Sequence, residues 1–458
     1  MRDLAYDLAE NAAKTNYNTL SPNALEVTKK FILDTLGCAI AGSTAAGCPT
    51  VVKLVQKWGG SEESTIIMNG SKVIAPNAAM VNGMMCQALD LDDIHEEAVL
   101  HANTTVLPAA LAVAERKGNI SGQDLITAVA VGVDVDCRVG LGVVGPLVWM
   151  LTSLGGYFGS AVAAGKIMGM DASGLHNAMG IAFTECAGTM QAVADRALVK
   201  RMIAGFAAKG GVLAAILAQE GITGARNIFE GQFGFFTLFF NGKYDRNRML
   251  KDLGQTFEGE NLSVKLYIGG RYTHCCIDAT LSLVKENNIK PENVKEVVAH
   301  VPENSFVLVG KPFAIGENPQ VDAQFSIPYA IALAIARGHV FIDDFFEEKI
   351  RADKQVMELA NKVKVVGDQG SIASVGRALT PCIIELKTRD NKVYSQRVAV
   401  TSGSPGKPAS MADIAEKFRK CCAFSAKPMP KGKIEEIIRL VNNLEQVPDI
   451  ANLVKLLA

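Results

Sequence analysis

The sequence predicts a mainly helical protein in which an α+β domain is inserted into an all-helical domain. Helical patterns with faces rich in alanine and glycine fill the first 265 residues, and β-branched segments bounded by prolines become prominent only after them. Helical patterns return after residue 405. A chain of 458 residues also exceeds what one hydrophobic core usually supports, which favours two domains. We therefore expect one domain from residues 1–265 and 405–458, and the other from residues 266–404.

The first helix signal of this kind lies at residues 21–42. Ser21 is a preferred N-cap residue, Pro22 suits the first helical position, and apolar residues such as Val27 and Phe31 recur at helical spacing. The later helices of this domain have faces rich in alanine and glycine, and we therefore expect these helices to pack closely against one another. The further helices of this domain are expected at 77–89, 106–117, 121–143, 159–168, 172–186, 199–219, 410–424, 433–443 and 449–457.

Strand signals characterise the inserted domain. Residues 294–301 are rich in β-branched valine. Residues 382–387 and 392–400 alternate in polarity around Asp390 and Asn391, which predicts a hairpin. Helical patterns at 273–286 and 323–336 interleave with these strands. This mixture predicts an α+β domain, and the cleft between two domains is a common place for a ligand.

The composition favours a small-molecule ligand. The chain is 49% hydrophobic, has a formal net charge of -1 and shows no basic stripe, which argues against nucleic-acid and membrane partners. The N-terminus lacks the order of basic, apolar and small residues that is typical of a signal peptide, so we expect a cytoplasmic protein. The apolar segment 203–218 is shorter than a membrane-spanning helix. The ten cysteines form no CxxC pair and are expected to be buried, reduced thiols.

The densest polar chemistry lies in residues 88–115, where acids and two histidines lead into an apolar helix. If Asp90 and Asp93 occupy one helical turn, they share a face, and Asp92 points elsewhere. Two carboxylates in one site raise the pKa of one of them, which makes it a usable proton carrier near neutral pH. The alternative is that these acids cap helices or stay solvated.

His101 is the candidate acid or base of this segment. It precedes small polar residues and a helix start, so its imidazole can project into a cleft. His95 stands among acids and is expected to be exposed or salt-bridged. A metal site formed by Asp90, Asp93 and His95 is an alternative, but their spacing matches no EF-hand, HExxH or Walker pattern. We therefore expect no metal.

Lys200 and Arg201 form a second candidate site at the front of an apolar helix rich in glycine and alanine. Cations there can bind a substrate carboxylate or stabilise a developing negative charge. The alternative is that both side chains snorkel from the helix surface, an interpretation favoured for Arg201.

A third candidate site lies at residues 265–278. A turn at Gly269-Gly270 is followed by Arg271, Tyr272 and His274 at a helix start, and an arginine beside a helix N-terminus favours anion binding. The alternative is an interdomain hinge. No dinucleotide fingerprint accompanies these residues, so no cofactor is expected, and the lack of a nucleophile elbow gives no support to covalent hydrolysis. Acids, imidazoles and cations together suit proton abstraction next to a carboxylate, which can lead to dehydration, decarboxylation or epimerisation.

At these residues the chain resembles the MmgE/PrpD family. Three segments carry the resemblance over nearly the whole chain: ALDLDDIHEEAVLHANTTVLPAALAVAE, LVKRMIAGFAAKGG and KLYIGGRYTHCCID. The resemblance implies a helical domain with an inserted α+β domain, a homodimer, and metal-independent chemistry on a carboxylic acid substrate. It also implies active-site roles for Asp90, His101, Lys200 and His274, and places near the substrate Asp93, Lys265, Arg271 and Tyr272.

Three positions depart from the family pattern. Ile94 stands where many members have threonine, and Met150 and Ile203 stand where histidine is common. A substrate with fewer carboxylates or a less polar arm is therefore expected. The first hypothesis is a cofactor-independent lyase with 2-methylcitrate dehydratase-like activity. The alternatives are an epimerase of an imino- or amino-dicarboxylate, a cis-aconitate decarboxylase-like enzyme, and a non-catalytic carboxylate-binding protein.

Overall fold

The computed structural model describes residues 2–368 and 381–458, and these fall into two compact units. Unit 1 comprises Met1–Leu262 and Ser410–Ala458, and unit 2 comprises Ser263–Ala409. The domain borders expected from the sequence lie a few residues from these limits. Whether each unit folds independently as a domain stays a prediction.

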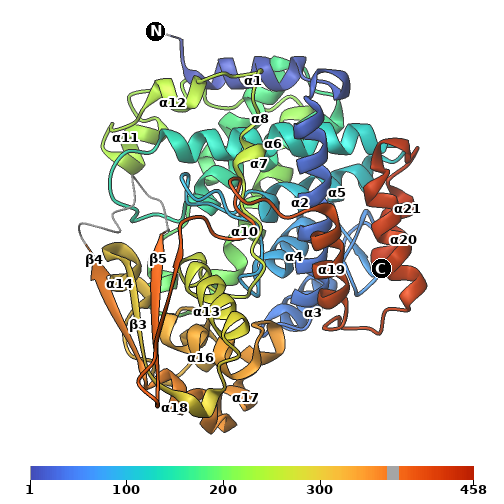
Figure 1. The fold of residues 1–458 in the computed structure, drawn as a ribbon. Helices are drawn as coiled ribbons and strands as arrows, with labels where there is room; N and C mark the ends of the chain where they lie inside the picture. Colours follow the sequence, from blue (N-terminus) through green and yellow to red (C-terminus); the bar gives the residue numbers. More distant parts are fainter. Residues whose placement is uncertain (1, 369–380) are drawn as a thin grey trace. The chain divides into compact units, whose positions relative to one another are not determined.

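Unit 1 is built almost entirely of helices (Figure 1). Its longer helices are α1 (Leu4–Lys14), α2 (Pro22–Gly42), α3 (Cys48–Trp58), α4 (Ala75–Gln87), α5 (Asn103–Lys117), α6 (Gly122–Gly142), α7 (Leu151–Met168), α8 (Ala172–Glu185), α10 (Ile203–Gln219), α19 (Met411–Cys422), α20 (Lys431–Asn442) and α21 (Ala451–Leu457). Short helices are α9 (Gln191–Ala194), α11 (Phe235–Phe240) and α12 (Arg246–Leu250), with 3-10 turns η1 (Tyr17–Thr19), η2 (Leu198–Met202), η3 (Glu258–Asn261) and η7 (Leu444–Gln446). A two-stranded ribbon, β1 (Ser64–Thr65) and β2 (Lys72–Val73), is its only sheet among the described residues. The mainly helical fold class is confirmed.

The capping signals predicted two helix starts correctly. The Ser21 hydroxyl accepts a hydrogen bond from the backbone N–H of Ala24 at the start of α2. Ser121 forms a capping box with Asp124 at the start of α6. These side chains satisfy N–H groups that have no partner inside the helix.

Two other helix starts were predicted too late. Helix α5 begins at Asn103 instead of 106, so Pro108 lies inside the helix and not at its start. Helix α7 begins at Leu151 instead of 159 and contains Gly155 and Gly156. Glycine is a poor helix former, but a Cβ on Gly156 would lie 2.6 Å from Thr105 on α5. Close packing between helices therefore outweighs intrinsic helix propensity here.

Helix α10 belongs to the core of unit 1, where it packs against α7, α4 and α8 (Figure 1). Together with η2 it makes an apolar helical stretch, Leu198–Gln219, which by length and composition could cross a membrane. The prediction of a segment too short to do so is therefore wrong. Of its most apolar window, 56% is buried inside the protein, as in the core helix of a folded domain.

Two glycines allow α10 to approach α4. A Cβ on Gly83 of α4 would lie 3.0 Å from the Cα of Gly205 on α10, and a Cβ on Gly205 would lie 2.2 Å from the Met80 carbonyl oxygen. Neither backbone can yield to an added methyl group without moving a whole helix. The contact matters for the site because α4 leads into the acidic segment and α10 follows Lys200.

We predict that Gly205→Ala lowers the free energy of unfolding by about 1–3 kcal/mol, the usual cost of overpacking a core. Gly432→Ala on α20 is the matched control, because no atom lies within 4 Å of the added Cβ. That variant should be neutral or stabilised by about 0.4–1 kcal/mol through the smaller entropy of the unfolded chain. Urea denaturation measures both, and equal effects would contradict the proposed crowding.

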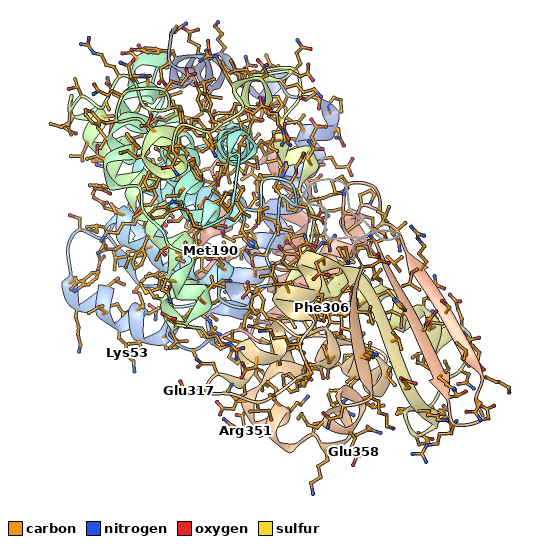
Figure 2. The ribbon with its side chains drawn as sticks, turned by 90° about the vertical axis from the view of Figure 1, so that its left-hand side faces the viewer. Lys53, Met190, Phe306, Glu317, Arg351 and Glu358 are labelled. Carbon is orange, nitrogen blue, oxygen red and sulfur yellow. The ribbon has the colours of Figure 1, made fainter. Side chains whose placement is uncertain are left out.

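Unit 2 contains a four-stranded mixed sheet in the order β4-β3-β5-β6. The strands are β3 (Val294–Pro302), β4 (Val363–Asp368), β5 (Cys382–Thr388) and β6 (Val393–Val398), and only the β3–β4 pair is parallel. The helices of unit 2 are α13 (His274–Glu286), α14 (Glu303–Val309), α15 (Pro319–Gln324), α16 (Ile327–Arg337), α17 (Glu347–Ala352) and α18 (Lys354–Ala360), with 3-10 turns η4 (Arg271–Thr273), η5 (Pro291–Asn293) and η6 (Ile342–Phe345). The exposed side chains of Arg351 and Glu358 point outward from α17 and α18 (Figure 2).

The sequence predicted this sheet only in part. The hairpin of β5 and β6 is confirmed, and Asn391 in its turn takes a left-handed conformation with φ of 65°. Strand β4 was missed, because most of its residues are half-buried and the strand signal is short. The single helix expected at 323–336 is two helices, since Ser326 caps α16 and accepts a hydrogen bond from the N–H of Tyr329.

Candidate active site

The acidic segment forms a loop between α4 and α5, which we call the acid loop (residues 88–102). The helical turn expected to align Asp90 with Asp93 is wrong, because residues 88–93 are not helical and Asp90 takes a left-handed φ of 52°. Aspartate tolerates this conformation better than most residues. Asp92, expected to point elsewhere, is the acid that lies beside His101.

His101 makes the most informative contacts of the loop. Its ring atom Nδ1 lies 2.6 Å from the backbone oxygen of Asp93 and 2.9 Å from Oδ2 of Asp92. Both neighbours are acceptors, so Nδ1 must carry the proton. In the neutral ring Nε2 then holds a free lone pair, the arrangement in which an acceptor on one nitrogen prepares the other for proton transfer. The ring remains partly accessible, with 15% of the side chain exposed.

Asp90 pairs with Lys200 across two segments of unit 1. The Lys200 Nζ atom lies 2.5 Å from Oδ1 of Asp90, and both side chains are largely buried. Lys200 lies in the 3-10 turn η2, just before α10. The close contact of α4 and α10 thus brings the acid and the amine together. Arg201, for which snorkelling was favoured, is instead buried and donates to the Ala46 carbonyl oxygen at 3.0 Å.

Asp93 is fully buried, with its Oδ2 atom accepting a hydrogen bond from the N–H of Asn103 at 3.2 Å. Burial, and then the negative charge of Asp92, raises the pKa of Asp93 to about 7. Asp136 on α6 is also buried, and burial holds its pKa well above the ordinary range. Asp93 can therefore carry a proton near neutral pH, as the sequence predicts for one acid of this segment.

The raised pKa of Asp93 predicts a pH-dependent stability. The folded state retains a proton that the unfolded state loses above its ordinary pKa of 3.8, so the fold loses stability as the pH rises from about 4 to about 7, and the loss is constant above that. Asp93→Asn removes that ionisation. Its unfolding free energy relative to wild type should therefore increase by up to about 4 kcal/mol between pH 4 and pH 8.

Urea denaturation at several pH values measures this difference. Asp390→Asn, at an exposed position in the β5–β6 turn, is the control and should give a flat difference over the same range. A flat difference for Asp93→Asn as well would show that Asp93 is ionised throughout.

His95 has a structural role in the loop. It is buried, and of the two expected states, exposure or a pairing with an acid, the second is present. Its Nδ1 accepts a hydrogen bond from the N–H of Ala98 at 3.0 Å, and Nε2 lies 3.3 Å from Oε2 of Glu258. Burial alone would raise the pKa of Glu258, but the hydrogen bond to His95 lowers it to about 2. His95 thus fixes the loop conformation that precedes His101.

Two buried residues that the sequence did not single out also hold the acid loop. The Lys417 Nζ atom on α19 lies 2.6 Å from Asp34 on α2 and donates to the Leu91 carbonyl oxygen at 2.7 Å. Both charged side chains are almost completely buried. The only sequence signal is a lysine and an aspartate on otherwise apolar helix faces. Because 326 residues separate Lys417 from Leu91, no local pattern could reveal the contact.

Unit 2 holds the cluster expected around Arg271 and His274. The Arg271 Nη1 atom donates to the Ser402 carbonyl oxygen at 3.1 Å and lies 3.4 Å from Nδ1 of His274. The ring of Tyr267 contacts His274 edge to face at 5.4 Å, and its hydroxyl donates to Oδ1 of Asp278 at 2.7 Å. Arg271 and His274 are both buried, so this cluster places a cation and an imidazole side by side.

The glycine pair before Arg271 is required by a close contact. Gly269 has a φ of 108°, and a Cβ there would lie 2.5 Å from the Gln324 carbonyl oxygen. The N–H of Gly270 donates to the same oxygen at 2.9 Å. Among the other expected residues, Lys265 is buried and Tyr272 is half-buried.

The departures from the family pattern all lie in unit 1. Ile94 follows the acid loop aspartates, Met150 precedes α7, and Ile203 begins α10. All three side chains are buried. Their proposed effect on the substrate stays a prediction.

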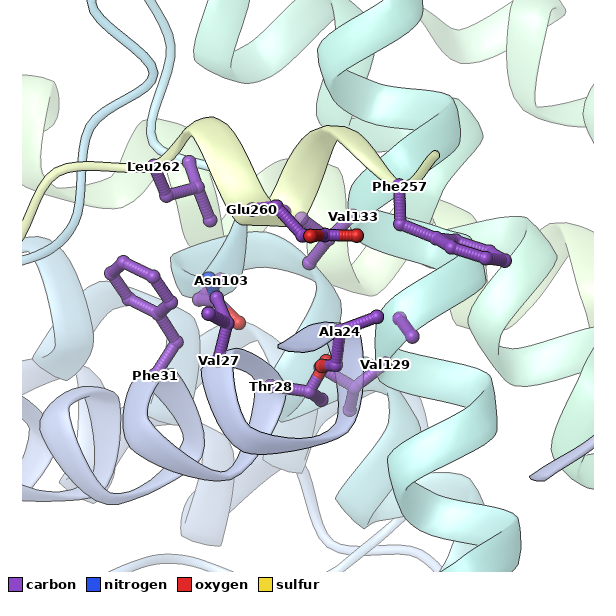
Figure 3. A pocket seen from close by; sticks show the side chains of 12 residues that line it. Ala24, Val27, Thr28, Phe31, Asn103, Val129, Val133, Phe257, Glu260 and Leu262 are labelled. Carbon is purple, nitrogen blue, oxygen red and sulfur yellow. The ribbon is translucent and has the colours of Figure 1, made fainter. Parts of the chain in front are cut away.

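A small cavity lies near Asn103 at the start of α5 (Figure 3). Phe31 of α2, Val133 of α6 and Phe257 line it, and its volume is about 10 Å³, room for roughly one water molecule. A polycarboxylic acid cannot enter so small and apolar a space. The cavity is therefore a packing feature and not the substrate site.

Unit 1 thus holds an oriented imidazole and a largely buried lysine–aspartate pair, and unit 2 holds a buried arginine beside a second imidazole. The model of the MmgE/PrpD N-terminal domain matches residues 6–247, and that of the MmgE/PrpD C-terminal domain matches residues 267–443. The chain belongs to the MmgE/PrpD family.

Several curated relatives extend over almost the whole chain. Cis-aconitate decarboxylase of Homo sapiens is 28% identical over 452 residues, which cover 96% of this chain and 91% of the relative. Cis-aconitate decarboxylase of Aspergillus terreus (strain NIH 2624 / FGSC A1156) is 27% identical and covers 95% of this chain and 92% of the relative. The enzyme of the same name from Mus musculus is 26% identical over 96% of this chain and 90% of its own length.

Proposed function

We propose that this protein is a cofactor-independent lyase that decarboxylates a cis-aconitate-like unsaturated polycarboxylic acid. The observation that carries the proposal is the orientation of His101, whose Nδ1 faces only acceptors and whose Nε2 is thereby prepared for proton transfer. The relatives named above favour this reaction over 2-methylcitrate dehydration, which was the first hypothesis from the sequence.

In the proposed reaction the bond between the substrate and one carboxylate breaks, and carbon dioxide leaves. The electron pair stays on the unsaturated acid as an extended carbanion. For this step the His101 ring starts as the cation with a proton on each nitrogen, and its Nε2 proton then quenches the carbanion at carbon. The ring returns to its cationic form by taking a proton from solvent. Asp92 stabilises that cation and keeps the proton on Nδ1.

A cation of unit 1 supplies a further role. Lys200 holds a substrate carboxylate or the developing negative charge, with Asp90 fixing its amine at 2.5 Å. In unit 2, Arg271 stands between Lys265 and Tyr272 in the sequence and lies beside the second imidazole, that of His274, and an arginine is suited to binding a carboxylate. A role for these unit 2 residues in the reaction stays a prediction.

We predict that His101→Asn lowers kcat by about 10²–10⁴-fold, the usual contribution of a general acid or base. Lys200→Met should lower it by about 10²–10³-fold, the usual effect of losing one group that stabilises charge. Both variants should retain wild-type circular dichroism. The matched controls are His339→Asn and Lys53→Met, whose side chains are exposed (Figure 2 shows Lys53) and should have no role in turnover. Near-full activity of His101→Asn and Lys200→Met would remove the proposed site.

The reaction itself can be tested with a panel of acids followed by NMR in deuterated water. The panel would contain cis-aconitate, 2-methylcitrate, iminodisuccinate and analogues with a less polar side group. The same panel would also be tested with enzyme treated with a chelator. We expect carbon dioxide release, deuterium in the product at the protonated carbon, and full activity after chelation.

Other outcomes would point to the alternatives. Alkene formation with loss of water would support the dehydratase. Deuterium in recovered substrate without any other product would support the epimerase. A raised Tm with no conversion of any acid would support the binding protein.

The expected homodimer also stays a prediction. Exposed apolar side chains near the start and end of η2 and α10 supply a surface for a second copy, and they include Leu198, Val199, Phe206 and Ile222. Light scattering after gel filtration would decide, since a monomer mass would contradict the dimer.

A further inference from the structure

Three cysteine thiols of unit 2 lie together although they come from two distant segments. Cys275 and Cys276 stand in the first turn of α13, and Cys382 is the first residue of β5. Their Sγ atoms all lie within 4.8 Å of one another, and all three residues are buried and free of disulfides. The proposed reaction gives none of these thiols a role.

The packing of α13 on the sheet brings the thiols together. Residues alternate along β5 between the two faces of the sheet, so Cys382, Ile384 and Leu386 share the buried face. Helix α13 contacts both β5 and β6. Because its first turn presents two adjacent cysteines, both sulfurs reach the third.

We propose that Cys275, Cys276 and Cys382 form a binding site for a soft, closed-shell metal ion, with Cu(I) preferred over Zn(II). Thiolate sulfur selects such ions among the biological metals. Among the residues that the structure describes, no histidine, aspartate or glutamate joins the three sulfurs to complete a four-ligand set. Three ligands suit Cu(I), whereas zinc in structural sites takes four.

The three sulfur atoms need to move only slightly closer together to bind one ion. Three sulfurs in a plane around one ion, each about 2.3 Å from it as in zinc–thiolate sites, would be separated by about 4 Å. The present sulfurs lie within 4.8 Å, so side-chain rotations can close the site. Binding of Cu(I) by three thiols would release their protons and leave a net charge that Arg271 offsets in part.

The adjacent pair Cys421-Cys422 in unit 1 offers a matched comparison. Both residues are buried and free, but no group of three ligands includes them among the residues described. Adjacent cysteines alone therefore do not make the proposed site. The third thiol, Cys382, is the feature that distinguishes the cluster in unit 2.

The test is titration of the full-length protein, kept reduced with a phosphine, with Cu(I) or Zn(II) against a chromogenic chelator. We expect one tightly bound Cu(I), weaker Zn(II) binding, and affinity that rises with pH. The variants Cys382→Ser and Cys276→Ser should no longer bind this one Cu(I) ion tightly, whereas Cys422→Ser should still bind it. No bound Cu(I) in the wild type, or unchanged binding in Cys382→Ser, would overturn the proposal. Tighter Zn(II) than Cu(I) binding would overturn the stated preference.

A measurement on the wild type avoids any dependence on how the variants fold. Protein with and without Cu(I) is alkylated during denaturation and then analysed by peptide mass spectrometry. Bound Cu(I) should slow the alkylation of Cys275, Cys276 and Cys382, and leave Cys421 and Cys422 unaffected. Equal alkylation of both groups of cysteines would contradict the assignment.

Discussion

The close approach of α4 and α10 is the constraint on which the unit 1 cluster depends. Backbone meets backbone where Gly83 faces Gly205. One helix ends at the acid loop and the other begins after η2, so the separation of Asp90 from Lys200 follows from the helix contact. The position of the ion pair is thus determined by two residues that have no functional group.

Buried charge is the second constraint, and it is balanced in two ways, by pairing with a lysine and by retaining a proton. Asp90 is neutralised by Lys200, and Asp34 by Lys417. No lysine or arginine of residues 2–368 and 381–458 forms an ion pair with Asp93, and its charge is balanced by retaining its proton up to about pH 7. An unpaired buried carboxylate costs several kcal/mol, so each solution also contributes to the stability of the loop. Asp92 remains beside His101, where its charge can act on the ring.

The sequence predicted those parts of the molecule that depend on local chemistry. The Ser21 and Ser121 caps, the hairpin around Asn391 and the mainly helical class all follow from short patterns. Strand β4 was missed because its pairing with β3 is parallel and comes through a long connection. The left-handed turn at Asp90 was missed because a helical pattern leads directly into it.

In the candidate site, too, the sequence predicted what depends on neighbouring residues and missed what depends on contacts between distant segments. His101 and Lys200 could be proposed from their neighbours in the sequence, but the partner of His101 could not, since Asp92 instead of Asp93 reaches it only when the loop is not helical. The Cys382 thiol belongs beside Cys275 only through the packing of α13 on β5. Contacts between distant segments are therefore what the structure adds.

The position of Lys417 late in the chain has a consequence for biosynthesis. Asp34 and the acid loop leave the ribosome hundreds of residues before α19 does, and Lys417 follows Leu91 by 326 positions. Until then the Asp34 carboxylate lacks the Lys417 ammonium group that lies beside it in the folded unit. The acid loop therefore gains this contact only after unit 2 has been synthesised, and a chain interrupted before α19 would lack the ammonium group that joins Asp34 to Leu91.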